Sequence, residues 1–201
     1  MAKLRRSNAD GAAGAVEEVA RIVAQIRHRW PRTRILLRGD SGFTREPLMA
    51  WCEANRVDYV FGLARNDRLE NEIVPELIMA TIESIRTGKT VRRFKNFTYA
   101  TLSSWSRERR VIGKAEVTGG DANPRFVVTS LTSAEAKPRH LYEKVYCARG
   151  EMENRIKECQ LDLFADRTSA ATMQANQLRL WFASMAYVLL CALRRIGLAH
   201  T

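Results

Sequence analysis

Helical and strand-like apolar patterns alternate through the first 86 residues, and this alternation restricts the fold more than any other feature. Two short apolar runs, 33–40 and 58–64, are bounded by turn residues and indicate buried strands. Apolar residues at helical spacing precede, separate and follow these runs, at 14–29, 46–55 and 67–86. Strands that alternate with helices form parallel sheets, because each crossover helix returns the chain to the same edge. We therefore expect residues 1–86 to form part of an α/β core.

Residues 87–135 have a different pattern, in which short runs of β character lie between glycine- and proline-containing turns. The runs are 91–102, 109–117 and 125–131. Strand-like runs separated by such turns favour hairpins over helical crossovers. We expect them to form an antiparallel β insertion.

From residue 136 the apolar spacing becomes helical again. The last helix is expected at about 172–196 and contains the longest apolar run, 181–193, interrupted only by Ser184. This run is shorter than the roughly 20 residues that a membrane-spanning helix needs, so it is interpreted as a buried core helix. We expect residues 136–201 to complete the α/β core.

The chain has 201 residues, of which 46% are hydrophobic, and a formal net charge of +11. The apolar content suffices for one sizeable core, and the positive excess favours a polyanionic partner, either nucleic acid or an anionic membrane surface. Between residues 86 and 114, nine basic residues stand against one acidic residue, Glu108. If the partner is nucleic acid, five of these cations are expected to contact its phosphates: Arg92, Arg93, Lys95, Arg109 and Arg110. The interleaved aromatic residues are expected mostly to pack into a core: Phe94, Phe97, Tyr99 and Trp105.

Cysteine usage and the start of the chain both favour a cytoplasmic location. The first ten residues contain basic side chains but no apolar segment of the kind that a secretory signal requires. The cysteines are scattered, without a CxxC pair or nearby histidines, at positions Cys52, Cys147, Cys159 and Cys191. This pattern favours reduced thiols over a disulfide framework or a zinc site.

Two sets of polar residues are candidates for chemistry. Asp40 lies where the first predicted strand ends, and ligands of open α/β sheets bind at the carboxyl ends of strands. The alternative is that Asp40 caps a turn or the next helix. Tyr146, Arg149, Glu153 and Lys157 follow one another at spacings of three and four, which places them on one stripe of a helix. The alternative there is a solvated helix face with ordinary ion pairs.

The spacing Tyr146-x2-Arg149-x3-Glu153 resembles the Y-R-E signature of insertion-sequence DDE transposases. The segments 149–158 and 162–169 are similar to the group 1 type of this DDE domain, and Arg38-Gly-Asp-Ser-Gly-Phe43 resembles the segment around its second aspartate. The likeness covers nearly the whole chain. It implies a ribonuclease-H-like fold that here is incomplete, and a bacterial, nucleoid-associated protein that acts on double-stranded DNA at transposon ends and targets, with a homodimer on DNA as one option and no membrane partner.

The resemblance also implies roles for individual residues. Asp40 and Glu153 would be catalytic carboxylates and ligands of Mg²⁺ or Mn²⁺, since hard cations favour oxygen ligands. Three such carboxylates would hold two ions across the scissile phosphate. Tyr146, Arg149 and Lys157 would contact phosphate. The family's signature lysine, seven residues after the glutamate, is replaced here by Gln160, so Lys157 is the alternative for that contact.

The first aspartate of the family has no match upstream of Asp40. Only 39 residues precede Asp40, and they contain one predicted helix and no predicted strand; Asp10 lies in a polar, glycine-rich start and is rejected. We therefore expect the first strands of the sheet to be absent and the chain to be inactive alone. The alternatives are a non-catalytic DNA-binding remnant, a ribonuclease-H-like nuclease unrelated to transposition, and a basic scaffold or membrane-surface protein.

Overall fold

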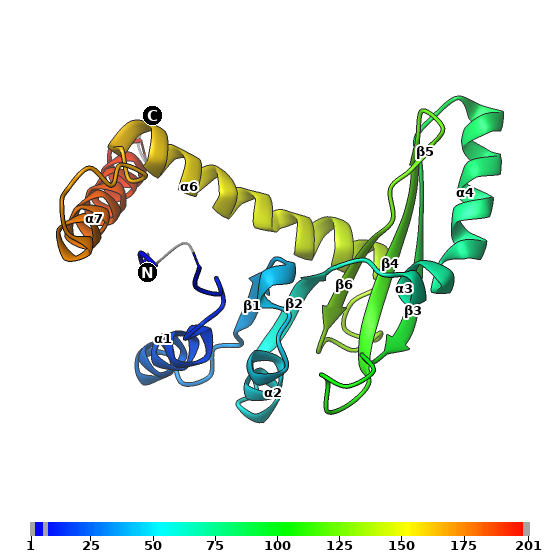
Figure 1. Cartoon of the computed structure of the whole chain (residues 1–201), viewed down its shortest axis with the longest axis horizontal. Helices are drawn as coiled ribbons and strands as arrows, with labels where there is room; N and C mark the ends of the chain where they lie inside the picture. Colours follow the sequence, from blue (N-terminus) through cyan, green and yellow to red (C-terminus); the bar gives the residue numbers. More distant parts are fainter. Residues whose placement is uncertain (1–2, 6–7, 199–201) are drawn as a thin grey trace. The chain divides into compact units, whose positions relative to one another are not determined.

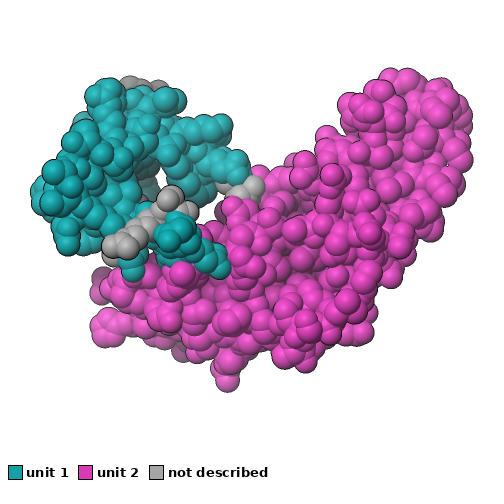
Figure 2. Space-filling view, in the orientation of Figure 1, with its two compact units in different colours: residues 1–10, 150–201 teal, residues 11–149 magenta. Residues whose placement is uncertain are grey.

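The computed structural model describes residues 3–5 and 8–198 of the chain. It consists of two units, residues 11–149 and residues 1–10 with 150–201, which Figure 2 shows in different colours. The first unit contains the whole β-sheet and the helices that cover it, and the second contains two long helices.

The unit of residues 11–149 begins with the predicted alternation of helices and strands (Figure 1). Its first elements are α1 (Ala15–Arg29), β1 (Leu36–Gly39), a 3₁₀ turn (Ser41–Phe43), α2 (Glu46–Ala54), β2 (Asp58–Leu63), α3 (Asp67–Glu72) and α4 (Val74–Thr87). The single helix expected at 67–86 is thus two helices. Pro75 lacks a backbone N–H and favours the first turn of a helix, so a new helix starts there, while the fully buried Ile73 anchors the junction.

The strands of residues 91–129 continue the same sheet that β1 and β2 begin. They are β3 (Val91–Tyr99), β4 (Arg109–Thr118), β5 (Asp121–Ala122) and β6 (Arg125–Thr129), and the strand order is β1-β2-β6-β4-β3 with β5 beside β4. β1 and β2 are parallel, whereas every other pair is antiparallel. The insertion is therefore antiparallel as expected, and it joins the parallel pair through the contact of β2 with β6. Within the described part of the chain, β1 pairs with β2 alone and forms one edge of the sheet.

Strict alternation of side chains gives the sheet a core on each face. On β2, Tyr59 and Phe61 belong to a cluster with residues of α1, α2 and α3, whereas Val60 belongs to a second cluster on the opposite face. Leu141 and Tyr142, which follow the last strand, cover that second face. Burying each of these large side chains contributes roughly 1.5–3 kcal/mol. The aromatic residues Phe94, Phe97, Tyr99 and Trp105 pack in these clusters, which confirms the expectation for them.

The segment after the sheet is helical throughout, but its helical geometry changes three times. It runs through α5 (Pro138–His140), a π-helical stretch (Leu141–Tyr146) and a 3₁₀ turn (Cys147–Arg149) before α6 (Gly150–Leu163). A π-helix is wider and a 3₁₀ helix is tighter than an α-helix, so the 3.6-residue period does not carry through this segment. The expected stripe is thus divided between elements: Tyr146 ends the π-helical stretch, whereas Glu153 and Lys157 lie four residues apart in α6. That the four side chains share one face stays a prediction.

The second unit consists mainly of α6 and α7 (Met173–Gly197). Glu158 of α6 joins the two helices, because it accepts a hydrogen bond from the Tyr187 hydroxyl at 2.7 Å and lies 3.7 Å from the Arg194 guanidinium. The backbone N–H of Leu4 donates to the Gln177 side chain at 2.7 Å, which fixes the described start of the chain to α7.

Helix α7 was expected to be a buried core helix, and this expectation was wrong. Its large apolar side chains are mostly exposed, because within this unit only α6 and the first residues lie against it. By length and composition alone α7 resembles a membrane-spanning helix, with a mean hydropathy of 1.3 over its most apolar window. One such helix is weak grounds for a membrane segment, because helices of soluble proteins meet the same criteria.

Candidate functional site

Asp40 lies at the carboxyl end of β1, the position at which open sheets bind ligands. Its Oδ1 atom accepts a hydrogen bond from the backbone N–H of Gly42 at 2.9 Å, so Asp40 caps the 3₁₀ turn that follows. The side chain remains exposed at the sheet end. The capping role of Asp40 is therefore confirmed, and the same turn fixes its carboxylate at the strand end.

The Tyr146 hydroxyl lies close to the backbone that follows Asp40, although the two residues are 106 positions apart in the sequence. A Cβ atom placed on Gly62 of β2 would lie 2.6 Å from the Tyr146 hydroxyl oxygen and 3.1 Å from the backbone nitrogen of Ser41. The Tyr146 hydroxyl therefore occupies the space above Gly62, next to the backbone that follows Asp40. Gly62 is the residue that allows this approach, because any side chain there would overlap the hydroxyl.

Two further contacts hold this arrangement. The Arg38 guanidinium of β1 donates a hydrogen bond to the carbonyl oxygen of Val145 at 3.0 Å, which ties the π-helical stretch to the strand that ends at Asp40. The Thr44 hydroxyl donates to the carbonyl of Gly62, which ties the turn after Asp40 to β2. The rings of Tyr142 and Tyr146 lie 5.5 Å apart, so Tyr146 is also packed against its own helix.

Two residues of the predicted signature belong to the unit of residues 1–10 and 150–201. Glu153 and Lys157 lie in α6, where both are exposed. The side chain of Arg149 is outside the described part of the structure. Within the described residues, no group of three or more His, Cys, Asp or Glu side chains lies close enough to hold a metal ion.

Arg109, one of the five cations predicted to contact phosphate, is a buried residue of β4. Its side chain is 2% exposed and forms ion pairs with Glu46 at 2.6 Å and Glu53 at 2.7 Å. The hydrogen bond from Arg109 lowers the pKa of Glu46, and Tyr59 donates a second hydrogen bond to Glu53 at 2.8 Å. A phosphate cannot reach this guanidinium, so the interpretation of Arg109 as a DNA contact is corrected: it joins β4 to α2.

Arg110 and Lys95 are also held by the protein itself. Arg110 donates to the carbonyl oxygens of Leu131, Thr132 and Ala136 at 2.8–2.9 Å, and so fixes the loop that follows β6. The Lys95 ammonium donates to the backbone carbonyl of Glu72 and lies 3.3 Å from its carboxylate. These contacts satisfy donors that the sequence pattern had assigned to DNA.

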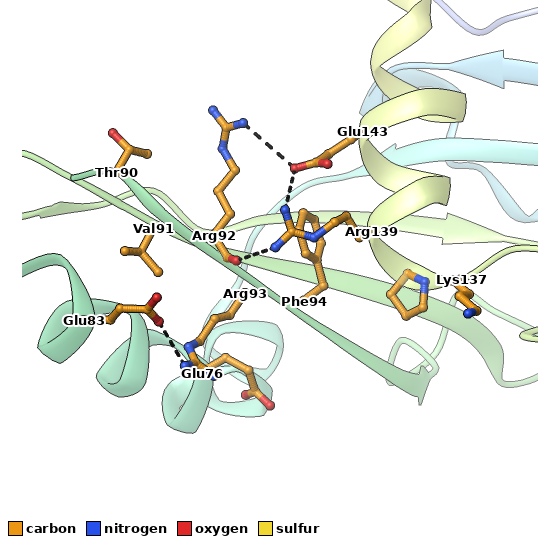
Figure 3. A pocket seen from close by; sticks show the side chains of 11 residues that line it. Glu76, Glu83, Thr90, Val91, Arg92, Arg93, Phe94, Lys137, Arg139 and Glu143 are labelled. Carbon is orange, nitrogen blue, oxygen red and sulfur yellow. Dashed lines mark hydrogen bonds and ion pairs between the residues drawn. The ribbon is translucent and has the colours of Figure 1, made fainter. Parts of the chain in front are cut away.

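Arg92 and Arg93 line an open groove of about 890 Å³ between β3, α4 and the helix that begins at Pro138 (Figure 3). Figure 3 shows that acidic side chains enter the groove beside them. Arg93 pairs with Glu83 at 3.0 Å, and Arg92 forms an ion pair with Glu116 of β4. A third arginine, Arg139, pairs with Glu143 at 3.4 Å. The groove therefore carries charges of both signs.

A family model described as Transposase DDE domain group 1 matches residues 1–201. The chain belongs to this family. Among curated proteins, none matches the sequence significantly. The fold is a mixed α/β sheet covered by helices, and within it this transposase domain places the Tyr146 hydroxyl close to the backbone that follows Asp40.

Gly62 and Arg38 complete the site of the transposase domain, but the sequence analysis gave them no role. A glycine inside a buried strand is a signal of close backbone approach, so Gly62 was detectable in principle. Arg38 alternates to the exposed side of β1 and gave no such signal, because its acceptor is a carbonyl 107 positions away in sequence.

Proposed function

We propose that this transposase domain binds DNA at the edge of the sheet where Asp40 and Tyr146 lie. We also propose that it takes part in phosphodiester cleavage and strand transfer only when further carboxylates, which the described residues do not bring together, complete the site. The approach of the Tyr146 hydroxyl to the backbone after Asp40, over Gly62, carries the proposal. A carboxylate at a strand end can hold a divalent cation that faces a DNA phosphate, and a hydroxyl near the same strand end can donate to a phosphate oxygen.

Each residue has a defined part in this proposal. Asp40 supplies the carboxylate at the strand end, and its turn keeps that carboxylate in place before DNA arrives. Tyr146 donates its hydroxyl hydrogen to a phosphate oxygen. Glu153, Lys157 and Arg149 belong to the same signature and are proposed as its further carboxylate and phosphate contacts. We also propose that the parallel pair β1–β2 is the part of a ribonuclease-H-like sheet that ends at the site.

Mg²⁺ or Mn²⁺ is the cation expected of this family, and it would polarise the scissile phosphate when bound. Asp40 is a suitable oxygen ligand. Among the described residues, however, no group of three or more His, Cys, Asp or Glu side chains could hold a metal ion, so these residues do not fit a complete two-ion centre. For this reason we propose that the chain alone binds DNA without cutting it.

A nicking assay tests the catalytic part of the proposal. The chain is incubated with supercoiled plasmid in MgCl₂ or MnCl₂, beside the variants Asp40→Asn and Asp121→Asn. Asparagine is an equally good cap, so Asp40→Asn removes the charge and keeps the turn, while Asp121 lies in β5, away from the strand end. We expect no nicking by any of the three. Nicking that Asp40→Asn abolishes and Asp121→Asn retains would overturn the claim that the chain is inactive alone.

Fluorescence anisotropy with a labelled duplex tests the DNA-binding part separately. Binding should weaken as salt rises, because phosphate contacts release counterions. Replacement of Tyr146 by Phe should reduce the affinity, since it removes the hydroxyl donor and retains the packed ring. A chain that shows no affinity for duplex at low salt would refute the proposed function.

A further inference from the structure

A second groove, on the α1–α2 side of the sheet-containing unit, is lined by arginines without acidic neighbours. Its volume is about 480 Å³, and it lies between the end of α1, the loop that follows, and the end of α2. The lining residues are Arg27, Pro31, Arg32, Thr33, Ala54, Asn55 and Arg56. Three arginines thus line one space, and the described lining contains no carboxylate. The groove around Arg92 and Arg93 differs in that Glu76, Glu83 and Glu143 line it too.

Arg56 holds a backbone conformation that side chains rarely adopt, with φ of 53°. It follows α2 in a Schellman-type ending, in which the N–H of Val57 donates to the carbonyl of Cys52 at 2.9 Å. Glycine is favoured at this position because it lacks a Cβ. An arginine at this position lines the groove at a conformational cost, and such outliers concentrate at functional sites.

The groove is held open by its own contacts. The Arg27 guanidinium donates to the carbonyl oxygen of Arg56 at 3.0 Å, which joins the end of α1 to the end of α2. A cation in the last turn of a helix also offsets the helix dipole, and Arg27 has this ordinary role. Arg32 and Arg56 lie beyond the helix ends, so the dipole does not account for them.

Trp30 precedes the lining segment Pro31–Thr33 and is 60% exposed. Its backbone N–H closes α1 by donating to the carbonyl of Ile26 at 2.7 Å, which fixes the position of the residue. An indole beside the groove would lose water contact if a large ligand lay across the arginines. The fluorescence of Trp30 can therefore report whether a ligand occupies the groove.

We propose that this groove binds the phosphate backbone of DNA through Arg32 and Arg56, as a contact separate from the strand-end site at Asp40. The inference rests on the proposed function, since it assumes that the domain binds DNA. Arginine forks match the geometry of phosphate oxygens and bind them in pairs. Phosphate contacts of this kind position a protein on DNA and read no sequence.

The test compares two double variants by fluorescence anisotropy with one labelled duplex over a range of salt concentrations. Arg32→Gln/Arg56→Asn removes two charges from the groove, and asparagine tolerates the positive φ of position 56. Arg21→Gln/Arg125→Gln removes two charges outside it. The groove variant should bind at least about tenfold more weakly, and its salt slope should fall by roughly 2, because each lost phosphate contact accounts for about 0.9. The control should retain the slope of the unaltered protein.

Tryptophan fluorescence gives a second readout that general charge loss does not imitate. Titration with the unlabelled duplex should change the emission of the unaltered protein, and Trp30→Phe should remove most of that change while leaving the affinity within about twofold. Equal weakening and equal salt slopes for the two double variants would overturn the groove site and leave DNA binding intact. If the unaltered protein did not bind the duplex at all, the proposed function would be overturned as well.

Discussion

The β1–β2 side and the β3–β4 side of the sheet carry arginines in different ways. On the β3–β4 side, Arg92, Arg93 and Arg109 are paired with glutamates from other segments. On the β1–β2 side, Arg32 and Arg56 face a groove whose described lining has no acidic residue. The β3–β4 side contains the stretch of sequence with the most basic residues, whereas the β1–β2 side contains the arginine groove and the site at Asp40 and Tyr146.

The comparison shows that the density of basic residues along the sequence is a poor guide to the charge of the folded surface. Between residues 86 and 114 only Glu108 is acidic, yet the cations of this stretch find partners among glutamates elsewhere in the chain: Glu46, Glu53, Glu72, Glu83 and Glu116. Antiparallel pairing and helix packing bring those partners to the strands. We infer that the cations of the β3–β4 side hold that side together, whereas two cations of the β1–β2 side, Arg32 and Arg56, are offered to a ligand.

The largest effect is expected for Arg109→Met, because it leaves Glu46 and Glu53 without their buried partner. Removal of one member of a buried ion pair typically costs about 3–5 kcal/mol of unfolding free energy. Urea denaturation measures it. The matched control is Arg107→Met, whose side chain is 66% exposed and only 3.8 Å from Glu53, and which should change stability by less than about 1 kcal/mol. Similar losses of stability for both variants would contradict the conclusion that Arg109 joins β4 to α2.

A second large effect is expected on the β1–β2 side for Gly62→Ala. The new Cβ would meet the Tyr146 hydroxyl at 2.6 Å and force a shift that costs about 1–3 kcal/mol. Tyr146→Phe should recover part of this loss, because it removes the oxygen atom that lies nearest. Gly150→Ala, whose Cβ would meet nothing within 4 Å, is the control. Urea denaturation of both single variants and the double variant gives the coupling energy, and strict additivity would show that Tyr146 does not lie over Gly62.

The sequence predicted the elements of this domain well because local patterns decide them. The two buried runs became β1 and β2, and the three later runs became β3, β4 and β6, since apolar periodicity and turn residues act within a few positions. Asp40 at a strand end follows directly from that prediction. Pro75 was a sequence signal for a new helix after Ile73, because proline favours the first turn of a helix. The signal was missed because the apolar spacing continues through this position.

The partners of individual side chains could not be predicted in this way. Arg109 and Lys95 look like surface cations in a strand pattern, and only the packing of α2 and α3 supplies Glu46 and Glu72. The π-helical stretch at Leu141–Tyr146 is likewise a product of tertiary packing, because Leu141 and Tyr142 must cover the sheet. Tyr146 was identified by family resemblance, whereas its place over Gly62 required the fold.

A smaller effect, on DNA affinity, tests the comparison directly. Arg92→Gln/Arg93→Gln removes two charges that are already paired with Glu116 and Glu83. We expect the affinity for a duplex to fall by less than about threefold, because the carboxylates already offset these cations in the folded protein. Anisotropy measurements beside Arg32→Gln/Arg56→Asn decide the matter. A larger loss for the Arg92 and Arg93 pair would reverse the roles assigned to the two sides.

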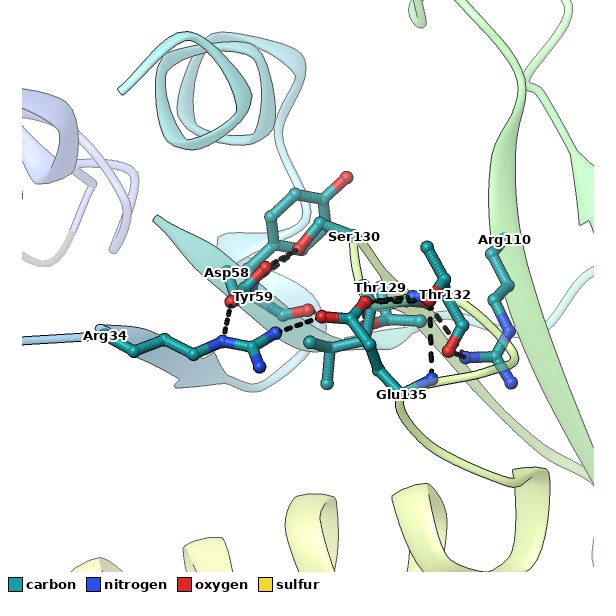
Figure 4. A network of polar contacts seen from close by, with 9 residues as sticks. Arg34, Asp58, Tyr59, Arg110, Thr129, Ser130, Thr132 and Glu135 are labelled. Atoms are coloured by element: carbon teal, nitrogen blue, oxygen red, sulfur yellow. Dashed lines mark hydrogen bonds and ion pairs between the residues drawn. The ribbon is translucent and has the colours of Figure 1, made fainter. Parts of the chain in front are cut away.

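The smallest effect concerns the loop that fixes the start of the β1–β2 side. Glu135 accepts hydrogen bonds from the Thr132 backbone and hydroxyl, and Arg34 joins Glu135 to Asp58 (Figure 4). The Thr132 hydrogen bonds, with the contact to Arg34, lower the pKa of Glu135 from its ordinary value of 4.5 to about 2. A lowered folded-state pKa stabilises the fold above the ordinary value, and this contribution is lost as pH falls from 4.5 toward 2.

Glu135→Gln should therefore flatten the dependence of unfolding free energy on pH between about 4.5 and 2, and leave it unchanged above pH 6. Thermal unfolding followed by circular dichroism across this pH range measures the slope. The effect is small because Glu135 is exposed to water, which screens the interaction with Arg34. Glu70→Gln is the control, since Glu70 lies 3.9 Å from Arg65 and lacks the Thr132 hydrogen bonds. If both variants had the same acid slope, the loop contact would have no part in fixing β1 and β2.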